Sequence, residues 1–368
     1  MILLKKFKLK KNNPFFKFSS NRLESNIRMF KNYFPGTLIF SVKANPCNLV
    51  LKIMKDNGVN YFDVASIKEV KVLKSLFKDV RLFFMNTVKS RQSIREAYIK
   101  YNVKDFSLDT SDELYKILEE TDYAKDLNLH LRLAITNKFS QISLSGKFGA
   151  KYREALEILD QMKKIQCKIG ISFHTGSQCL NPKAYIDAMK VAKKVIRKSN
   201  IDLDYFNVGG GFPAKYPGSN ILPLNEYFMI IKNEFKKLDL SKDVKLLAEP
   251  GRCLVSDSMS LNVRVNLRKD NFLYINDGIH GSLHDAGKYK FKHSVTISSR
   301  KVRDKKLVPF SFYGPTCDSS DFIEGPFLIP NCIREGDWIE IQEMGAYSTT
   351  MQSDFNGFYS EREIFVED

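Results

Sequence analysis

The sequence lacks several features that would assign it to a particular class of protein. It has no run of roughly 18 or more uncharged apolar residues, so we expect no transmembrane helix. The N-terminal segment MILLKKFKLKKNN has no long apolar run and no small-residue cleavage site, which argues against a signal peptide. The six cysteines form no CxxC pair, which argues against a disulfide framework and a zinc site. We therefore expect a cytoplasmic protein without a bound metal.

The charge is strongly positive, yet the sequence contains no nucleic-acid-binding motif. Lysine and arginine number 58 against 42 acidic residues, a formal net charge of +16. The lysines run through the whole chain with acids among them, and zinc-finger spacing, an RNP-type aromatic motif and a long basic block are all missing. The simplest interpretation is a lysine-rich solvated surface. We expect neither nucleic acid nor membrane as a partner.

Strand-like and helical patterns alternate through the first two thirds of the chain. Helical periodicity over segments such as 66–77, 111–120, 152–165 and 184–198 separates short apolar runs. These runs are interpreted as strands at 37–42, 61–64, 80–85, 105–109, 129–135, 168–173, 204–208 and 245–249. Eight strands that alternate with helices predict a parallel (β/α)8 TIM-like barrel.

Past residue 255 the pattern changes to strand-like alternation without long helices. The strand-like segments lie at 260–268, 271–277, 293–299, 307–314 and 337–345. This alternation predicts an antiparallel β-sandwich or β-barrel domain. We place the barrel domain at 18–255 and the C-terminal β domain at 256–368, and we expect residues 1–17 to join the β domain.

Polar residues stand where the predicted barrel strands end. Lys43 follows the first strand, Asp63 lies at the end of the second, and His174 follows the sixth. The run Gly209–Gly211 follows the seventh strand, and Glu249 closes the eighth. Because the C-terminal ends of barrel strands share one mouth, we expect these residues to lie together. Taken singly, each has a structural explanation, such as a surface amine, a core histidine or a tight turn.

The chemistry of this set fits one cofactor. A triple glycine lets backbone N–H groups approach a phosphate. An amine can form an imine with an aldehyde, and a carboxylate opposite it can keep a pyridine nitrogen protonated. We therefore predict that Lys43 binds pyridoxal 5'-phosphate (PLP) as a Schiff base.

Seven short motifs occur in order along nearly the whole chain. They are SVKAN, FDVAS, FHTGSQ, NVGGGFP, AEPGR, YGPTCDSSD and EMGAYS. Together they resemble the fold-type III PLP-dependent decarboxylases, the ornithine/diaminopimelate/arginine decarboxylase family, and bacterial ornithine/lysine decarboxylases in particular. The resemblance implies the two-domain fold and a head-to-tail homodimer in which each active site borrows residues from the partner.

The resemblance also implies roles for the matched residues. Lys43 is the Schiff-base lysine, Glu249 pairs with the pyridine nitrogen, and His174 stacks on the ring. The implied phosphate site contains Ser177, Gly211, Arg252 and Tyr347, with Gly209 and Gly210 in the same glycine loop. The residues that line or support the cofactor site are Asp63, Glu69 and Arg132.

Residues of the β domain complete the partner's site in the implied dimer. Cys317 protonates the carbanion at Cα, and Asp318 binds the distal ammonium of the substrate. Lys147 and Asp321 match a pair that bridges the two subunits. For Cys317 taken alone, the ordinary alternative is a buried, inert thiol.

The CDSSD loop narrows the implied substrate. Diaminopimelate enzymes typically carry Glu at the position of Asp318, and the arginine-specific relatives are much longer chains. L-ornithine therefore remains, with putrescine as its product and a place in polyamine biosynthesis. L-lysine, which would give cadaverine, remains as an alternative because it differs by one methylene.

The segment NDGIHGSLHDAGKYKFKH departs from the family pattern. Tyr289 stands where eukaryotic ornithine decarboxylases carry a second acid for the distal amine, and we predict that Asp285 takes this role. His280 and His284 are expected only to pack the loop. An alanine-racemase-like enzyme and an inactive decarboxylase-like regulator remain as rivals. The regulator is disfavoured because Lys43, Glu249 and Cys317 are all present.

Overall fold

The computed structural model describes residues 13–144, 146–298, 306–358 and 363–368. These residues divide into two units. The barrel unit contains residues 23–215 and 219–255, and the β unit contains the described part of 1–22 together with 216–218 and 256–368. Among the described residues, none of the helices has the length and apolar character needed to cross a membrane.

A parallel sheet that returns to its own starting point forms the centre of the barrel unit. Its strand order is β2-β12-β11-β9-β7-β6-β5-β4-β3. The bounds are β2 Thr37–Leu38, β3 Phe40–Ser41, β4 Tyr61–Val64, β5 Arg81–Phe84, β6 Asp105–Leu108, β7 Asn128–Arg132, β9 Lys168–Ser172, β11 Tyr205–Asn207 and β12 Lys245–Ala248. Because β2 and β3 are consecutive pieces of one segment, the two ends of the path meet. The predicted TIM-like barrel is confirmed.

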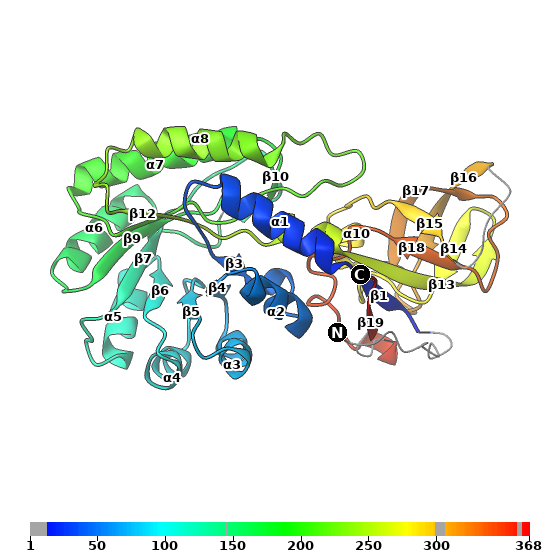
Figure 1. Ribbon diagram of the computed structural model, residues 1–368, viewed down its shortest axis with the longest axis horizontal. Helices are drawn as coiled ribbons and strands as arrows, with labels where there is room; N and C mark the ends of the chain where they lie inside the picture. The colour runs from blue at the N-terminus through cyan, green and yellow to red at the C-terminus, as the bar shows by residue number, and fades with distance from the viewer. Residues whose placement is uncertain (1–12, 145, 299–305, 359–362) are drawn as a thin grey trace. The chain divides into compact units, whose positions relative to one another are not determined.

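Helices surround this sheet (Figure 1). Their bounds are α1 Ser20–Tyr33, α2 Asn48–Asp56, α3 Ile67–Leu76, α4 Arg91–Tyr101, α5 Ser111–Glu120, α6 Tyr152–Lys163, α7 Lys183–Ser199, α8 Leu224–Lys236 and α9 Arg252–Val255. In α7 the buried residues Ala188, Ala192 and Val195 recur at the three- and four-residue spacing of one helix face. Ser66 and Thr110 cap α3 and α5 by accepting a backbone N–H with their hydroxyl groups. Helices α3 and α5 therefore begin where the sequence supplies a cap, and α7 buries one apolar face.

Seven of the eight predicted barrel strands end one to three residues earlier than expected, and two of these differences concern the site. The first ends at Ser41, and Val42–Ala44 form a 3-10 turn (η1) that carries Lys43. The strand predicted at 129–135 is β7, which ends at Arg132 because Leu133 then pairs with Ala150 instead. The chain beyond β7 also forms a small two-stranded antiparallel sheet, in which β8 (Ser140–Ile142) pairs with β10 (Ser177–Cys179). Both changes occur at the C-terminal ends of the barrel strands.

The β unit is a mixed sheet, not the purely antiparallel one predicted. Its path is β15-β18-β13-β14-β16-β17, with β1 on β13 and β19 on β1. The bounds are β1 Phe15–Phe18, β13 Met259–Lys269, β14 Phe272–Ile275, α10 His284–Lys288, β15 Val295–Ile297, β16 Leu307–Tyr313, β17 Phe322–Pro330, β18 Trp338–Ile341, η3 Phe355–Gly357 and β19 Glu363–Val366. The β1–β19 and β14–β16 pairs are parallel. The long connection through α10 and β15 permits the parallel return from β14 to β16.

Candidate active site

The amine of Lys43 lies against a buried carboxylate where the barrel strands end. Ser41, the last residue of β3, pairs with Asp63 of β4. Lys43 Nζ lies 2.7 Å from Asp63 Oδ2, and the two side chains are 41% and 2% exposed. Ser41 Oγ donates to the same Asp63 oxygen at 2.8 Å and lies 3.2 Å from the carbonyl oxygen of Glu249. The amine is therefore held in place by a buried acid but can be reached from solvent.

Glu249, directly after β12, is held by a neutral donor. Asn207 Nδ2 donates to Glu249 Oε1 at 2.7 Å, and Asn207 Oδ1 accepts the Gly209 N–H at 2.8 Å. Burial, with repulsion from Asp63, raises the pKa of Glu249 to about 7, although the Lys43 charge lowers it in part. A protonated nitrogen placed beside such a carboxyl group would stabilise its ionised form.

His174, Arg132 and Glu249 line one small cavity, together with Met85, Ser107, Ser172 and Phe173. The Gly176 N–H donates to His174 Nδ1 at 3.0 Å, so the proton of the neutral imidazole is on Nε2. Burial and the charges of two nearby cations hold the pKa of His174 well below its ordinary value. His174 is thus a neutral ring that lines the same cavity as Glu249, as the sequence predicted.

The glycine run after β11 is packed too closely for side chains. A Cβ on Gly209 would collide with the carbonyl oxygen of Phe173, and one on Gly210 would lie 2.6 Å from the carbonyl oxygen of Glu249. Tyr185 Oη donates to the Gly210 carbonyl at 2.9 Å and fixes the loop. A fixed loop without side chains can offer its N–H groups to a phosphate. Together with the amine, the neutral ring and the buried acid, this cradle fits PLP.

Other predicted cofactor residues lie at the same ends of the barrel strands. Arg252, the first residue of α9, donates Nε–H to Ser177 Oγ at 3.3 Å, so two predicted phosphate ligands are in contact. Glu69 in the first turn of α3 accepts the Ala65 N–H at 2.6 Å, and burial raises the pKa of this carboxyl. Burial also lowers the pKa of Arg132.

The β unit carries the remaining predicted residues. Cys317 is exposed, so it is not the buried thiol of the ordinary alternative, and its N–H donates to Asn356 Oδ1 at 3.1 Å. Asp318, beside it, is partly exposed. Tyr347 has a left-handed backbone with φ of +64°, and Asp285 lies in α10.

Asp321 is occupied inside its own chain. It is 1% exposed, and its carboxylate accepts the N–H of Ile279 at 2.8 Å and the hydroxyl of Thr316 at 2.7 Å. The predicted bridge from Lys147 to a partner's Asp321 stays a prediction. In this structure Asp321 instead anchors the loop that carries Cys317 and Asp318.

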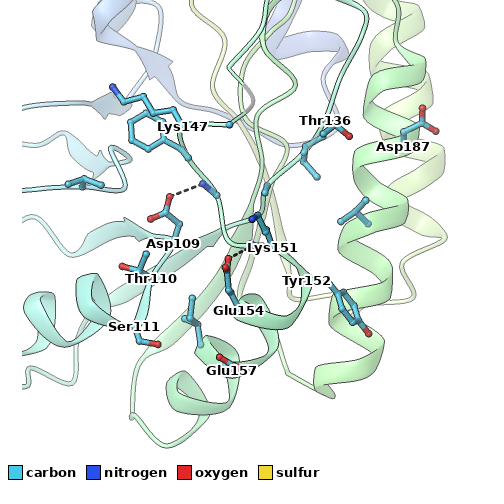
Figure 2. A pocket seen from close by; sticks show the side chains of 18 residues that line it. Asp109, Thr110, Ser111, Thr136, Lys147, Lys151, Tyr152, Glu154, Glu157 and Asp187 are labelled. Atoms are coloured by element: carbon cyan, nitrogen blue, oxygen red, sulfur yellow. Dashed lines mark hydrogen bonds between the residues drawn. The ribbon is translucent and has the colours of Figure 1, made fainter.

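A wide pocket of about 920 Å³ lies beside the predicted cofactor residues, not among them. Figure 2 shows side chains from α5, α6 and α7 around it, with Lys147 at its rim. Asp109 accepts the Gly149 N–H at 2.7 Å and so holds the loop that carries Lys147. None of the predicted cofactor ligands lines this pocket, and we do not assign it to the cofactor.

Sequence reasoning missed two residues of the site. Ser41 links Asp63 to the Glu249 carbonyl, and Asn207 holds the Glu249 carboxylate. Both stand in predicted motifs, SVKAN and NVGGGFP, as polar residues at the ends of buried strands. A polar residue at the end of a buried strand was therefore the sequence feature that could have identified both.

Residues 20–256 match the family model described as "Pyridoxal-dependent decarboxylase, pyridoxal binding domain". The chain belongs to this family. It is a PLP-dependent amino-acid decarboxylase, as the geometry around Lys43 and Glu249 fits.

Relatives within the family are named for different basic amino acids. A probable ornithine decarboxylase of Dictyostelium discoideum is 32% identical over 87% of this chain and 72% of the relative. A lysine/ornithine decarboxylase of Selenomonas ruminantium is 30% identical over 96% of this chain and 90% of the relative. The structure of the Paramecium bursaria Chlorella virus arginine decarboxylase bound to agmatine has a TM-score of 0.85 at 26% identity.

The viral structure corrects one prediction from the sequence. It is matched over 97% of its own length by 96% of this chain, so an arginine decarboxylase can be as short as this protein. The argument from chain length against arginine is therefore wrong, and the choice of substrate must come from the site.

Proposed function

We propose that this decarboxylase acts on a basic L-amino acid, with L-ornithine preferred and putrescine as the product. The observation that carries the proposal is the set of residues at the barrel mouth, where Lys43 meets Asp63 and Glu249 stands beside His174. The partly exposed carboxylate of Asp318 supports the choice of a substrate with a distal cation. We further propose a cytoplasmic homodimer.

Each residue at the mouth has a task in this proposal. Lys43 would hold the cofactor through its aldehyde carbon. PLP supplies a conjugated cationic ring that accepts the electron pair left by departing carbon dioxide. Glu249 holds the proton on the pyridine nitrogen, and His174 presents its neutral ring to the cofactor. The phosphate is held by Ser177, Gly209, Gly210, Gly211, Arg252 and Tyr347, with Arg132 and Asp63 supporting the site.

The β unit of a second copy completes the site in the proposed head-to-tail dimer. Its Cys317 delivers a proton to Cα, which prevents protonation at a wrong carbon. Its Asp318 binds the distal ammonium, and Asp285 is proposed as a second acid for the same group. The exposure of Cys317 is compatible with a role toward another subunit.

Carbon dioxide release tests the substrate. The purified enzyme with PLP is assayed for kcat/KM with L-ornithine, L-lysine, L-arginine and meso-diaminopimelate. One methylene is worth about 10- to 200-fold in a fitted pocket, so we expect at least about a tenfold preference for ornithine over lysine. Preference for lysine would change the product to cadaverine, and release from none of the four would overturn the proposed function.

Mixing two inactive variants tests the shared site. Lys43→Ala and Cys317→Ala each disable one contribution, so a mixed dimer has one site with both defects and one intact site. We expect up to about a quarter of wild-type activity after random subunit exchange, since about half of the dimers are mixed. No recovery after exchange has been confirmed by mass spectrometry would contradict the shared site.

A further inference from the structure

His280, which was expected only to pack its loop, contacts Asp318, the acid proposed to bind the substrate's distal ammonium. His280 Nε2 lies 2.8 Å from Asp318 Oδ2, and the two side chains are 28% and 32% exposed. His280 lies between β14 and α10, whereas Asp318 lies between β16 and β17. Both belong to the β unit, so the contact is made within one subunit.

The surrounding loops hold His280 in place. Its ring packs on Phe355 with ring centroids 4.9 Å apart, and its carbonyl oxygen accepts the Ser353 N–H at 2.9 Å. Cys317, next to Asp318, is bonded in turn to Asn356 of the same 353–357 segment. The contact between His280 and Asp318 therefore belongs to a set of three joined loops.

The hydrogen bonds of Asp318 leave its two oxygens unequal. Oδ2 accepts from Ser320 Oγ at 2.7 Å as well as from His280, whereas Oδ1 accepts only the Ser320 N–H at 2.9 Å among the contacts of the described residues. The Ser320 bonds, with help from His280, lower the pKa of Asp318 to about 2. An ionised carboxylate only accepts, so His280 Nε2 is the donor. Since each carboxylate oxygen has about two acceptor positions, Oδ2 is filled and Oδ1 keeps one.

We propose that His280 is a positioning residue that makes Asp318 select a terminal ammonium over a guanidinium. This inference rests on the proposed function. An ammonium is a compact charge that can bind through Oδ1 alone. A guanidinium binds a carboxylate best through two parallel N–H···O bonds, which require an acceptor position on both oxygens. With His280 and Ser320 on Oδ2, the bidentate arrangement is blocked, and ornithine or lysine is favoured over arginine.

Two substitutions at one position test the role of the N–H donor. His280→Leu removes the donor, and His280→Gln can place an amide N–H near the same point. We expect His280→Leu to reduce the ratio of kcat/KM for L-ornithine to that for L-arginine by about tenfold, the size of one hydrogen bond to a charged group. The change should appear mainly in KM, because the α-carbon chemistry is untouched. His280→Gln should keep the ratio within about threefold of wild type.

A neighbouring histidine gives the matched control. His284 lies in α10, with its ring 6.0 Å from that of Tyr289, and no hydrogen bond to Asp318 is present among the described contacts. His284→Gln should leave the ornithine-to-arginine ratio unchanged. Ser320→Ala is a second test, because it removes the other hydrogen-bond donor to Asp318 Oδ2. Ser320 is exposed, and its substitution should shift the ornithine-to-arginine ratio in the same direction as His280→Leu.

Binding of product-like amines supplies a readout that does not depend on turnover. Calorimetry on the holoenzyme compares 1,4-diaminobutane, 4-guanidinobutylamine and 1-butylamine, the last lacking a distal cation. In His280→Leu the preference for the diamine over the guanidino amine should fall, while the affinity for butylamine stays the same. If the preference for the diamine over the guanidino amine is unchanged in both His280→Leu and Ser320→Ala, the role of His280 is overturned but the proposed function is not. An inactive wild-type enzyme that also binds all three amines equally would overturn the proposed function.

Discussion

Buried acids occur at both ends of the barrel, and their neighbours differ. The mouth, defined here by Ser41, Lys43, Asp63, Asn207 and Glu249, lies at the C-terminal ends of the strands. The floor is defined by Arg81, Asp105, His130 and Tyr205. Three of these four residues begin their strands, β5, β6 and β11. The two groups therefore share one scaffold but lie at opposite ends of its strands.

The acid of the floor is fully paired. Asp105 accepts from Arg81 Nε and Nη2 at 2.7 Å each and lies 3.1 Å from His130 Nε2. Arg81 also donates to Tyr205 Oη at 3.0 Å. Although burial opposes the charged form, the bonds from His130 and Arg81 lower the pKa of Asp105. A bidentate guanidinium pair of this kind holds strands together.

One acid of the mouth is less well compensated: Asp63 is paired with Lys43, whereas Glu249 has no such charged partner in hydrogen-bond contact among the described residues. The Glu249 carboxylate is bonded to an amide instead of a guanidinium, and its pKa is raised to about 7. His174 beside it is held neutral, with its pKa lowered by burial and nearby cations. In a TIM barrel, polar residues at this end serve chemistry and those at the other end serve stability. The comparison shows that a buried acid whose charge is fully paired, such as Asp105, serves stability. A buried acid whose charge is not fully paired, such as Glu249, is available to bind a ligand.

Lys43→Ala should have the largest effect and should separate the two ends most clearly. Losing the amine removes the covalent link to the cofactor, so we expect kcat to fall by about 10³-fold or more. The visible absorbance of the PLP-loaded protein should change as well. Lys164→Ala, directly after the C-terminal end of α6, is the control, because its exposed amine forms an ion pair only with Asp160 among the described contacts. An unchanged spectrum and rate would refute the role of Lys43.

Asp105→Asn should give the opposite result at the floor. It leaves the Arg81 charge partly buried without its acid, and breaking a buried pair costs about 3–5 kcal/mol of unfolding free energy. The rate at 25 °C should stay within about twofold, as expected of a change remote from the chemistry. Urea denaturation measures the stability. Asp160→Asn, which breaks an exposed pair, is the matched control and should leave the unfolding free energy almost unchanged.

A loss of rate in Asp105→Asn without a loss of stability would contradict the assignment of the floor. The pH dependence gives a further check. The native pKa of Asp105 lies below the ordinary value of 3.8, so the stability that it contributes is present above that pH. It should be lost as the pH falls through the lowered pKa.

The sequence predicted the mouth better than the floor for a physical reason. Lys43, Glu249 and the glycine run stand in short motifs at strand ends, where parallel topology brings them together. Arg81, Asp105 and His130 stand at or inside strands with no common spacing, so their contact depends on the shear of the closed barrel. No local pattern records that shear.

The β unit was predicted less completely. β17 was missed because Gly325, Pro326 and Pro330 interrupt its pattern, and parallel pairing of β14 with β16 cannot be read from alternation. The contact of His280 with Asp318 joins residues 38 positions apart through two loops. Loop conformation decides such a contact, so the sequence could name Asp318 by motif but not its partner.

Glu249→Gln should change the unfolding free energy less than Asp105→Asn. The sign of this change, stabilising or destabilising, is the informative result. The native pKa of about 7 lies above the ordinary 4.5, so between these values the native state binds more protons than the unfolded chain. Unfolding free energy of cofactor-free wild type should therefore fall as the pH rises from about 4.5 to about 7. Gln keeps the acceptor for Asn207 without the charge, so at pH 8 the variant should be more stable by up to about 3 kcal/mol.

The same substitution should weaken catalysis, because a neutral amide cannot hold a proton on the pyridine nitrogen, and kcat should fall by about 10²-fold. Urea denaturation of cofactor-free protein at pH 4.5, 6 and 8 measures the stability difference, which should vanish at the lowest pH. Glu157→Gln on the exposed face of α6 is the control and should show no such trend. A variant that is less stable than wild type at pH 8 would mean that the Glu249 charge is well compensated. The mouth would then resemble the floor, and the contrast between the two ends would fail.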